Sequence, residues 1–358
     1  MKKLLQVLLL ISFAGMAHTM QKEKVLPKKT KIHLETALQS GDLKSLRKAL
    51  NGGVSPDMII DDKGCTLLGD SCTKGRVDFV RLLLEKGASP NIQKKDGVTA
   101  LMLACQFGHV EIVKLLLAHD KTNPNIKADN GATALMCACL FGHSEVVKLL
   151  LSHEKINLNI QANSGVMALM LACDSGHAEV VELLLTHEKI DPNIKSNDGG
   201  TAFIVACQNG HTEIVKLLLA HKGVDPNIQT NTGCTAVMLA CENGHVEIVR
   251  LLLAHKGVDP NIQANNGSTV LLFACEYGHT EVVQLLLAHK KVDPNIQNNT
   301  GLSLLMIVCF KGNTEVVKSL LEYGVLLDLI HDGDTALDIA KKKNHKNIVK
   351  LFEKYKAC

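Results

Sequence analysis

Cysteine and histidine recur at fixed spacing along this chain, and together they could bind zinc or support thiol chemistry. In "LMLACQFGHVEIVKLLLAH", residues 101–119, one Cys is followed by two His, and similar segments start at Leu135, Leu169, Phe203, Val237 and Leu271. A zinc ion needs three or four ligand atoms within about 2.3 Å, whereas equivalent residues of stacked helices lie roughly 8–10 Å apart. We therefore expect no metal site, and a metal or redox sensor is the weakest functional alternative.

Most of the cysteines share one repeat position, where we predict buried thiols that act as small apolar residues. A disulfide needs Cα atoms within about 7 Å, which is less than the expected helix separation. Cys65, Cys234 and Cys358 fall outside this series and are expected to be exposed. The series consists of Cys72, Cys105, Cys139, Cys173, Cys207, Cys241, Cys275 and Cys309.

The histidines form two series, one before and one after a predicted helix, whose ends are roughly 15 Å apart. We expect them to make turn and helix-end hydrogen bonds, and a His at a helix C-terminus also suits the helix dipole. The first series is His109, His143, His177, His211, His245 and His279. The second series is His119, His153, His187, His221, His255 and His289.

A repeat of 34 residues must position these side chains. Gly recurs at this interval at positions 108, 142, 176, 210, 244, 278 and 312. The apolar residues of 101–105 fall on one face of a short helix, and those of 112–116 on one face of a second. Such a small helix pair cannot bury its apolar faces alone, so the repeats must stack into a solenoid.

The repeat resembles an ankyrin repeat. "GVTALMLACQFGHVEIVKLLL" from Gly97 and "GCTAVMLACENGHVEIVRLLL" from Gly233 match the family pattern G-x-T-P-L-H-x-A-x-x-x-G-H-x-E-V-V-x-L-L-L, with Ala and Met replacing its Pro and His. The resemblance implies an all-α solenoid of helix-turn-helix units joined by β-turn loops, with no cofactor. We assign capping units to residues 33–62 and 333–358, and repeats starting near residues 63, 97, 131, 165, 199, 233, 267 and 301.

The first 17 residues are typical of a secretory signal peptide. Lys2 and Lys3 precede an apolar run shorter than the ~20 residues of a membrane span, and Gly15 and Ala17 suit cleavage after Ala17. We expect export to the periplasm or beyond, with a host cytosol as a further destination; an uncleaved membrane anchor is the alternative. Residues 18–32 are expected to form a solvated basic spacer.

Charge argues against nucleic acid as the ligand. The chain carries +3 overall, and the local +6 of residues 1–32 leaves −3 for residues 33–358. A nearly neutral array lacks the basic face that nucleic-acid binding requires. We expect a monomer that binds a protein partner, without nucleic acid and without stable membrane insertion.

Residues that differ between otherwise similar repeats are the predicted binding residues. In ankyrin-like solenoids the end of the first helix and the adjoining turn line a concave face, so the resemblance implies a groove formed by the two residues before each Gly-His or Gly-Asn, here called the variable pairs. Their aromatic members suggest binding hot spots, and their acidic members indicate a partner with apolar anchors and a basic residue or two. The variable pairs are Gln106 and Phe107, Leu140 and Phe141, Asp174 and Ser175, Gln208 and Asn209, Glu242 and Asn243, Glu276 and Tyr277, and Phe310 and Lys311.

The turn tips between repeats are a second candidate contact region. Asn and Asp favour such turns for backbone reasons alone, so their variation is a weaker signal. The predicted tip residues are Lys95, Asp96, Asp129, Asn130, Asn163, Asn197, Asp198, Asn231 and Asn265.

The sequence favours a non-enzymatic protein-interaction scaffold, exported by a bacterium and acting on a host protein. It contains no nucleophile elbow, phosphate-binding loop, zinc-protease or kinase signature. A regulatory inhibitor or protective partner of another exported protein is the alternative.

Overall fold

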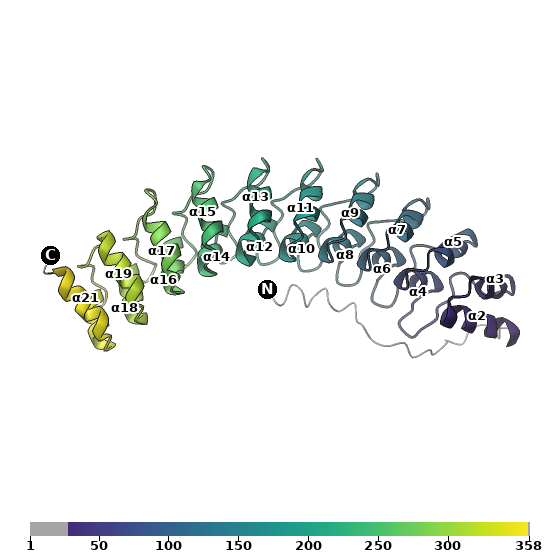
Figure 1. Cartoon of the computed structure of the whole chain (residues 1–358), viewed down its shortest axis with the longest axis horizontal. Coiled ribbons are helices and arrows are strands. Elements are labelled where there is room, and N and C mark those ends of the chain that lie inside the picture. The colour runs from purple at the N-terminus through teal and green to yellow at the C-terminus, as the bar shows by residue number, and fades with distance from the viewer. Residues whose placement is uncertain (1–27, 357–358) are drawn as a thin grey trace. The chain divides into compact units, whose positions relative to one another are not determined.

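The computed structural model describes residues 28–356, and the chain divides into an N-terminal part, residues 1–191, and a C-terminal part, residues 192–358. The predicted leader at residues 1–17 and Cys358 lie outside the described residues. Between residues 28 and 356 the chain forms 20 helices, α2 to α21 (Figure 1). In this range the β-structure consists of isolated β-bridges, and there is no β-strand. The prediction of an all-α fold is confirmed.

The helices come in pairs, a first helix and a second helix for each repeat. The N-terminal part contains α2 (Lys28–Ser40), α3 (Leu43–Asn51), α4 (Leu67–Thr73), α5 (Val77–Glu85), α6 (Ala100–Gln106), α7 (Val110–Leu117), α8 (Ala134–Leu140), α9 (Ser144–Leu151), α10 (Ala168–Asp174) and α11 (Ala178–Leu185). The C-terminal part contains α12 (Ala202–Asn209), α13 (Thr212–Ala220), α14 (Ala236–Glu242), α15 (Val246–Ala254), α16 (Val270–Glu276), α17 (Thr280–Leu287), α18 (Leu304–Lys311), α19 (Thr314–Tyr323), α20 (Ala336–Lys342) and α21 (Lys346–Lys356).

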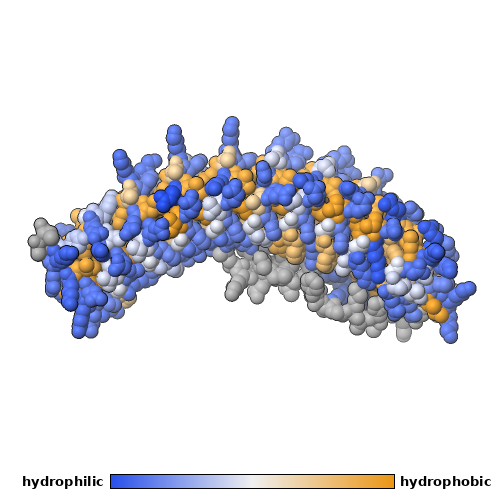
Figure 2. Space-filling view, viewed as in Figure 1, coloured by the Kyte–Doolittle hydropathy of each residue, from blue (hydrophilic) through white to orange (hydrophobic). Residues whose placement is uncertain are grey.

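Stacking between repeats builds the core of each part. First helices pack against neighbouring first helices, as α6 does against α4 and α8, and second helices pack in the same way, as α15 does against α13 and α17. Figure 1 shows these helices as two layers within each part. Apolar residues form a band through the layers, bordered by polar side chains (Figure 2). Each repeat therefore buries its apolar faces against its neighbours, as the sequence predicts.

Helix α2 begins earlier than the predicted boundary between the basic spacer and the repeat array. Residues 28–32 were assigned to the solvated spacer 18–32, but α2 begins at Lys28. Thr30 is buried, and a Cβ atom at Gly52 would lie 2.7 Å from its hydroxyl oxygen, so this turn packs closely against the end of α3. Tertiary contact thus extends the helix into a sequence that composition alone assigns to solvent.

A hydroxyl side chain starts most of the first helices. The Thr99 hydroxyl accepts a hydrogen bond from the Met102 amide at 3.3 Å, and the Thr133 hydroxyl accepts one from the Met136 amide at 3.4 Å. Such N-caps satisfy an amide that has no partner within the helix. Helix α10 differs, because Met167 occupies the N-cap position and makes no side-chain cap bond.

The first His series joins neighbouring repeats. The His143 Nε2 atom lies 3.0 Å from the carbonyl oxygen of Gln106, and the His279 Nε2 atom lies 2.8 Å from that of Glu242. The ring also covers the glycine of the preceding repeat: Gly142 has φ 73°, and a Cβ atom there would lie 2.6 Å from the Nδ1 atom of His177. The predicted helix-end hydrogen bonding is confirmed, and it crosses between repeats.

Five members of the second His series cap the turn that follows their second helix, whereas the Nδ1 atom of His289 has no partner within the described residues. The Nδ1 atom of His255 accepts a hydrogen bond from the Gly257 amide at 3.2 Å, and that of His187 accepts one from the Lys189 amide at 3.2 Å. An accepting Nδ1 atom carries no proton. These contacts therefore use a lone pair of the ring, and the expected interaction with the helix dipole stays a prediction.

The predicted series of cysteines is buried. Cys105, Cys139 and Cys173 are each 0% exposed, and all cysteines within residues 28–356 are free thiols. Burial raises the pKa of the Cys137 and Cys309 thiols to about 12. A thiol with so high a pKa forms little of the reactive thiolate.

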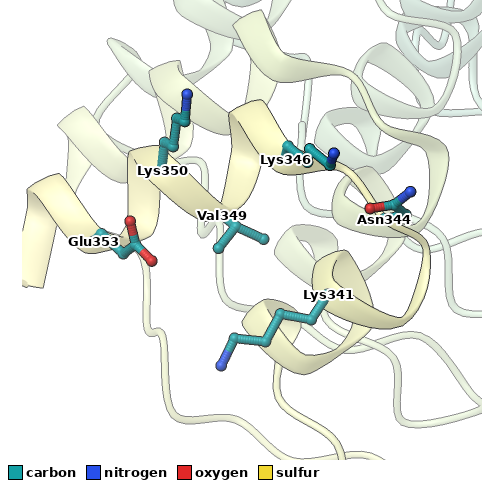
Figure 3. Close-up of a pocket in the computed structure, with 6 residues that line it drawn as sticks. All are labelled: Lys341, Asn344, Lys346, Val349, Lys350 and Glu353. Atoms are coloured by element: carbon teal, nitrogen blue, oxygen red, sulfur yellow. The ribbon is translucent and has the colours of Figure 1, made fainter.

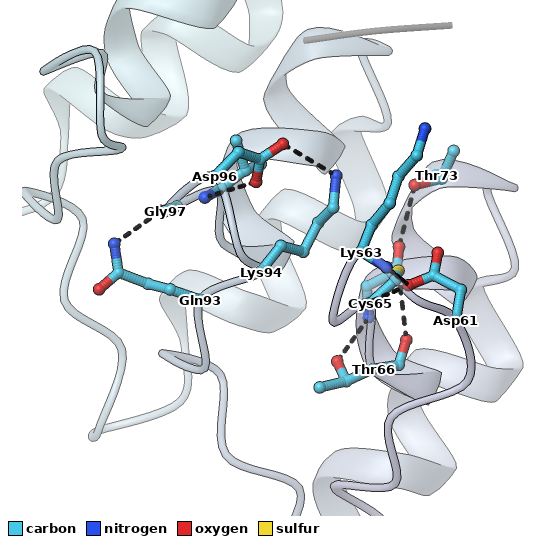
Figure 4. A network of polar contacts seen from close by, with 11 residues as sticks. Asp61, Lys63, Cys65, Thr66, Thr73, Gln93, Lys94, Asp96 and Gly97 are labelled. Carbon is cyan, nitrogen blue, oxygen red and sulfur yellow. Dashed lines mark hydrogen bonds and ion pairs between the residues drawn. The ribbon is translucent and has the colours of Figure 1, made fainter. Parts of the chain in front are cut away.

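The prediction that Cys65 is exposed is wrong. Its side chain is 8% exposed, and burial raises the pKa of the thiol to about 12. The Asp61 carboxylate holds the turn over it by accepting hydrogen bonds from the amides of Lys63 and Cys65, at 3.0 and 2.8 Å (Figure 4). Cys234, at the equivalent turn of a later repeat, is half-buried.

Candidate interaction surface

The variable pairs lie where each first helix ends, and most of them reach the surface. Phe141, Tyr277 and Phe310 are 41%, 54% and 55% exposed, and Phe107 is half-buried. Leu140, Asp174, Ser175, Gln208, Asn209 and Glu242 are also half-buried, whereas Asn243, Glu276 and Lys311 are exposed. In each part these residues mark a surface that changes from repeat to repeat while the framework beneath it does not.

Gln106 does not belong to this surface. Its side chain is only 7% exposed, and its Oε1 atom has no hydrogen-bond partner within the described residues. Other repeats leave this position half-buried or exposed. The prediction that Gln106 is an accessible contact residue is therefore wrong.

Side chains of successive variable pairs contact one another in the C-terminal part. Burial raises the pKa of the Tyr277 hydroxyl, and so does the nearby carboxylate of Glu242, one repeat earlier. The Lys311 amine donates to the Glu276 carboxylate at 3.0 Å and lies 6.0 Å from the centre of the Tyr277 ring. Lys343, at the equivalent position of the last repeat, lies 3.9 Å from the centre of the Phe310 ring. The second residue of a pair thus contacts the first residue of the preceding pair.

In the N-terminal part the aromatic members of the pairs stack on histidine instead. The rings of Phe107 and His109 are 6.1 Å apart, and those of Phe141 and His143 are 6.3 Å apart. Each of these histidines is fixed in turn by a hydrogen bond to the preceding repeat, at Thr73 or Gln106. The two phenylalanines therefore rest on rigid supports, which reduces the conformational entropy lost when a partner binds.

The acidic members of the variable pairs all have partners within the chain. Glu276 pairs with Lys311, Glu242 acts on the Tyr277 hydroxyl, and Asp174 also takes part in an interaction. The sequence suggested that these carboxylates would attract a basic partner, but it could not show that they are already occupied. The structure therefore weakens the reason for expecting basic residues in the partner.

One set of surface residues was missed by the sequence reasoning. Phe273 and Ile307 lie four residues before Tyr277 and Lys311 on the same helices, and both are half-buried, whereas Leu103 and Leu171 at the equivalent position are buried. Residues four apart lie on one helix face. The change to a larger or branched residue at this position in the last repeats was the available signal.

The turn tips are joined to one another by backbone and side-chain hydrogen bonds. The Asp129 amide donates to the Asp96 carbonyl and the Asn163 amide to the Asn130 carbonyl, both at 3.0 Å. Lys94 and Asp96 form an ion pair at 3.4 Å within their turn (Figure 4). Lys95, Asn197 and Asp198 are exposed. The side-chain amides of Asn163, Asn231 and Asn265 each donate to the preceding turn, at 2.7, 2.8 and 2.9 Å.

These bonds give the tip asparagines a structural role that their exposure alone does not reveal. Each amide that holds a neighbouring turn has less freedom to reach a partner. The prediction that the turn tips contact a partner stays a prediction, with the variable pairs as the stronger candidates.

The loops that follow the second helices contain a further asparagine series that the sequence reasoning did not interpret. The Asn125 side chain donates to the Lys155 carbonyl at 2.6 Å and accepts from the Asn157 amide at 2.9 Å. Asn227 makes the same two contacts with Gly257 and Asp259, at 2.7 and 2.9 Å. The recurring Pro-Asn or Leu-Asn of the sequence was the signal, and its role is to fasten each loop to the next repeat.

A cavity of about 350 Å³ lies at the C-terminal end of the described helices. In Figure 3 the amines of Lys341 and Lys350 point away from each other, so they do not converge on one ligand. Lys341 occupies the register of the buried cysteines, and Glu353 that of the buried Leu321. A further repeat stacked here would bury both charges. The cavity is lined by Lys341, Asn344, Lys346, Val349, Lys350 and Glu353.

The described residues offer neither a metal site nor a membrane-spanning helix. Residues 28–356 contain no group of three or more His, Cys, Asp or Glu side chains placed to hold a metal ion. No helix in this range is both long enough and apolar enough to cross a membrane.

Comparison with known proteins agrees with the helix pairs. The sequence model of a family described as "Ankyrin repeats (3 copies)" matches residues 34–128, 121–196, 155–230, 188–264 and 271–357. Together these matches cover most of the chain.

Three relatives show how local the similarity to individual proteins is. The Ankyrin repeat and KH domain-containing protein mask-1 of Caenorhabditis elegans is 37% identical over 84 residues, which are 24% of this chain and 3% of that protein. Human Ankyrin repeat domain-containing protein 63 is 55% identical over 42 residues, 12% of this chain and 11% of its own length. Human Photoreceptor ankyrin repeat protein is 44% identical over 79 residues, 21% of this chain and 18% of its own. The matched segment spans less than a fifth of each relative.

Proposed function

This chain belongs to the ankyrin-repeat family, and from that premise we propose that it is a non-enzymatic scaffold that binds a partner protein through its variable pairs. Ankyrin repeats are general protein-interaction modules, and the family is generally non-catalytic. The observation that carries the proposal is the exposure of Phe141, Tyr277 and Phe310 on an otherwise repeated framework. Exposed aromatic side chains on a rigid support are the usual anchors of protein interfaces.

Alanine substitution tests this proposal. The triple variant Phe107→Ala, Phe141→Ala, Tyr277→Ala is compared with the natural protein in affinity capture of partner proteins, followed by mass spectrometry. Each aromatic hot spot contributes on the order of 2 kcal/mol or more, so the partner should be lost from the variant. A folded variant that retains every partner would contradict the proposal.

A matched control places three substitutions on the second helices. Glu111, Glu145 and Glu213 are exposed and lie in the first turns of α7, α9 and α13. Their change to Ala removes charge and area from the other helix layer, and it should leave capture intact. Equal loss in both variants would indicate damage to the fold or a partner bound elsewhere.

We further propose that the chain is exported and that its partner is a protein outside the bacterial cytoplasm, a host protein included. The support is the sequence alone: Lys2 and Lys3 before an apolar run, with small residues before Ala17. Expression in a bacterium, fractionation and N-terminal sequencing test this, with a mature N-terminus at His18 as the expected result. An intact Met1 on cytoplasmic protein would refute it, and an intact Met1 on membrane-bound protein would support the anchor instead.

A further inference from the structure

The last three repeats carry a surface cluster that the other repeats lack. We call it the aromatic–lysine patch, formed by Tyr277, Phe310, Lys311 and Lys343. Both aromatic rings are more than half exposed. They lie on α16 and α18, which pack side by side, and α18 packs against α20, where Lys343 follows the last helical residue. The patch therefore spans three adjacent first helices.

The two lysines are held at the surface next to the aromatic rings. Lys343 lies 3.9 Å from the centre of the Phe310 ring, and Lys311 lies 6.0 Å from that of Tyr277. Attraction between a cation and a ring contributes about 0.5–1 kcal/mol at exposed sites, enough to favour these rotamers without removing the amines from water. The patch thus presents apolar area and positive charge together.

The charges of this region are unevenly paired. Glu276 neutralises Lys311, and Asp334 pairs with the neighbouring Lys342 at 2.6 Å. Within residues 28–356 no carboxylate lies within ion-pair distance of Lys343. Residues 334–356 contain seven Lys and three acidic residues, a net charge of +4, and Glu242 beside Tyr277 adds one negative charge at the other end of the patch. An incoming carboxylate would therefore meet an unpaired amine at Lys343 and a favourable field around it.

We propose that the aromatic–lysine patch binds an acidic protein segment in which carboxylate side chains flank an aliphatic or aromatic residue. The apolar residue covers Phe310 and Tyr277, and a carboxylate pairs with Lys343. This inference rests on the proposed function and names the chemistry of the partner. It replaces the basic partner that the acidic variable residues suggest, because Glu276 is already paired with Lys311 and Glu242 already faces the Tyr277 hydroxyl.

Selection from a displayed library of random 12-residue peptides tests the inference on the folded full chain. The enriched peptides should carry net negative charge and a Leu, Ile, Phe or similar residue. The strongest is then synthesised with a fluorescent label, and its Kd is measured by fluorescence polarisation. Loss of one hot-spot contact weakens binding by about tenfold or more, so Phe310→Ala and Lys343→Glu should each raise the Kd by that factor.

Two matched variants separate the patch from general effects. Lys318→Glu reverses a charge on α19, where Lys318 is half exposed and already close to Glu322 at 4.0 Å, and it should change the Kd by less than about twofold. Phe141→Ala removes a ring that is 41% exposed from the N-terminal part, and it distinguishes a peptide bound at the patch, whose affinity it leaves unchanged, from a peptide bound at another variable pair. Urea unfolding of all four variants checks that the fold is retained, as expected for surface positions.

Three results would overturn the inference. Enriched peptides that are basic or neutral would exclude an acidic partner. Peptides whose binding is lost in Phe141→Ala but not in Phe310→Ala would leave the proposed function standing and refute the patch. If no selected peptide depends on any variable pair for binding, both the proposed function and the patch are contradicted.

Discussion

Replacing Asn227 with Ala should weaken the contact between two neighbouring repeats of the C-terminal part. Its side chain donates to the Gly257 carbonyl at 2.7 Å and accepts from the Asp259 amide at 2.9 Å. Each hydrogen bond contributes about 0.5–1.5 kcal/mol net. Water can reach both backbone groups after the substitution. We therefore expect the free energy of unfolding to fall by about 1–2 kcal/mol, which is the lower half of the range for two hydrogen bonds.

Urea unfolding followed by circular dichroism measures this loss. In a repeat protein, stability depends on the contacts between neighbours, so the variant should unfold at a lower urea concentration.

Asn266→Ala is the matched control. The Asn266 side chain accepts a hydrogen bond only from the amide of Ser268, two residues away in the same turn. Loss of this local hydrogen bond should lower the free energy of unfolding by about 0.5 kcal/mol. If Asn227→Ala is no more destabilising than Asn266→Ala, the loop asparagines do not fasten the repeats and the reasoning fails.

Two further predictions concern the buried thiols and the close contact of glycine with histidine. At pH 8 a thiol with a pKa of about 12 is ionised in about one molecule in 10,000, so Cys65, Cys137 and Cys309 should react slowly with Ellman's reagent in the native protein. Cys234 should react quickly together with Cys358, which the sequence predicts to be exposed, and Cys234→Ser should lower the fast phase by one thiol. Fast reaction of the buried thiols would contradict their burial. Gly142→Ala should destabilise the fold by at least about 1 kcal/mol more than Gly53→Ala, because both have positive φ but only a Cβ atom at Gly142 meets a neighbour, the His177 ring at 2.6 Å. Equal thermal unfolding midpoints would show that the ring moves aside freely.

The sequence alone determined the repeat, the helix pairs and the burial of the cysteine series. These features depend on local rules: the Thr99 hydroxyl caps its own helix, and the apolar residues of 112–116 follow the helical period. A register that recurs every 34 residues also fixes which residues face the neighbouring repeat. The variable pairs were found in the same way, by asking which positions break the repetition.

Only the tertiary structure decided what each side chain contacts across the repeats. Lys311 pairs with Glu276, Asn227 reaches Gly257, and these partners are 35 and 30 residues apart. The period brings such positions near each other, but the reach and direction of the side chains select the partner. For the same reason, the sequence predicted exposure for Cys65 and Gln106, and stacking buried both. The charge that a partner meets in the last repeats depends on these cross-repeat contacts, because they determine which carboxylates and amines are already paired.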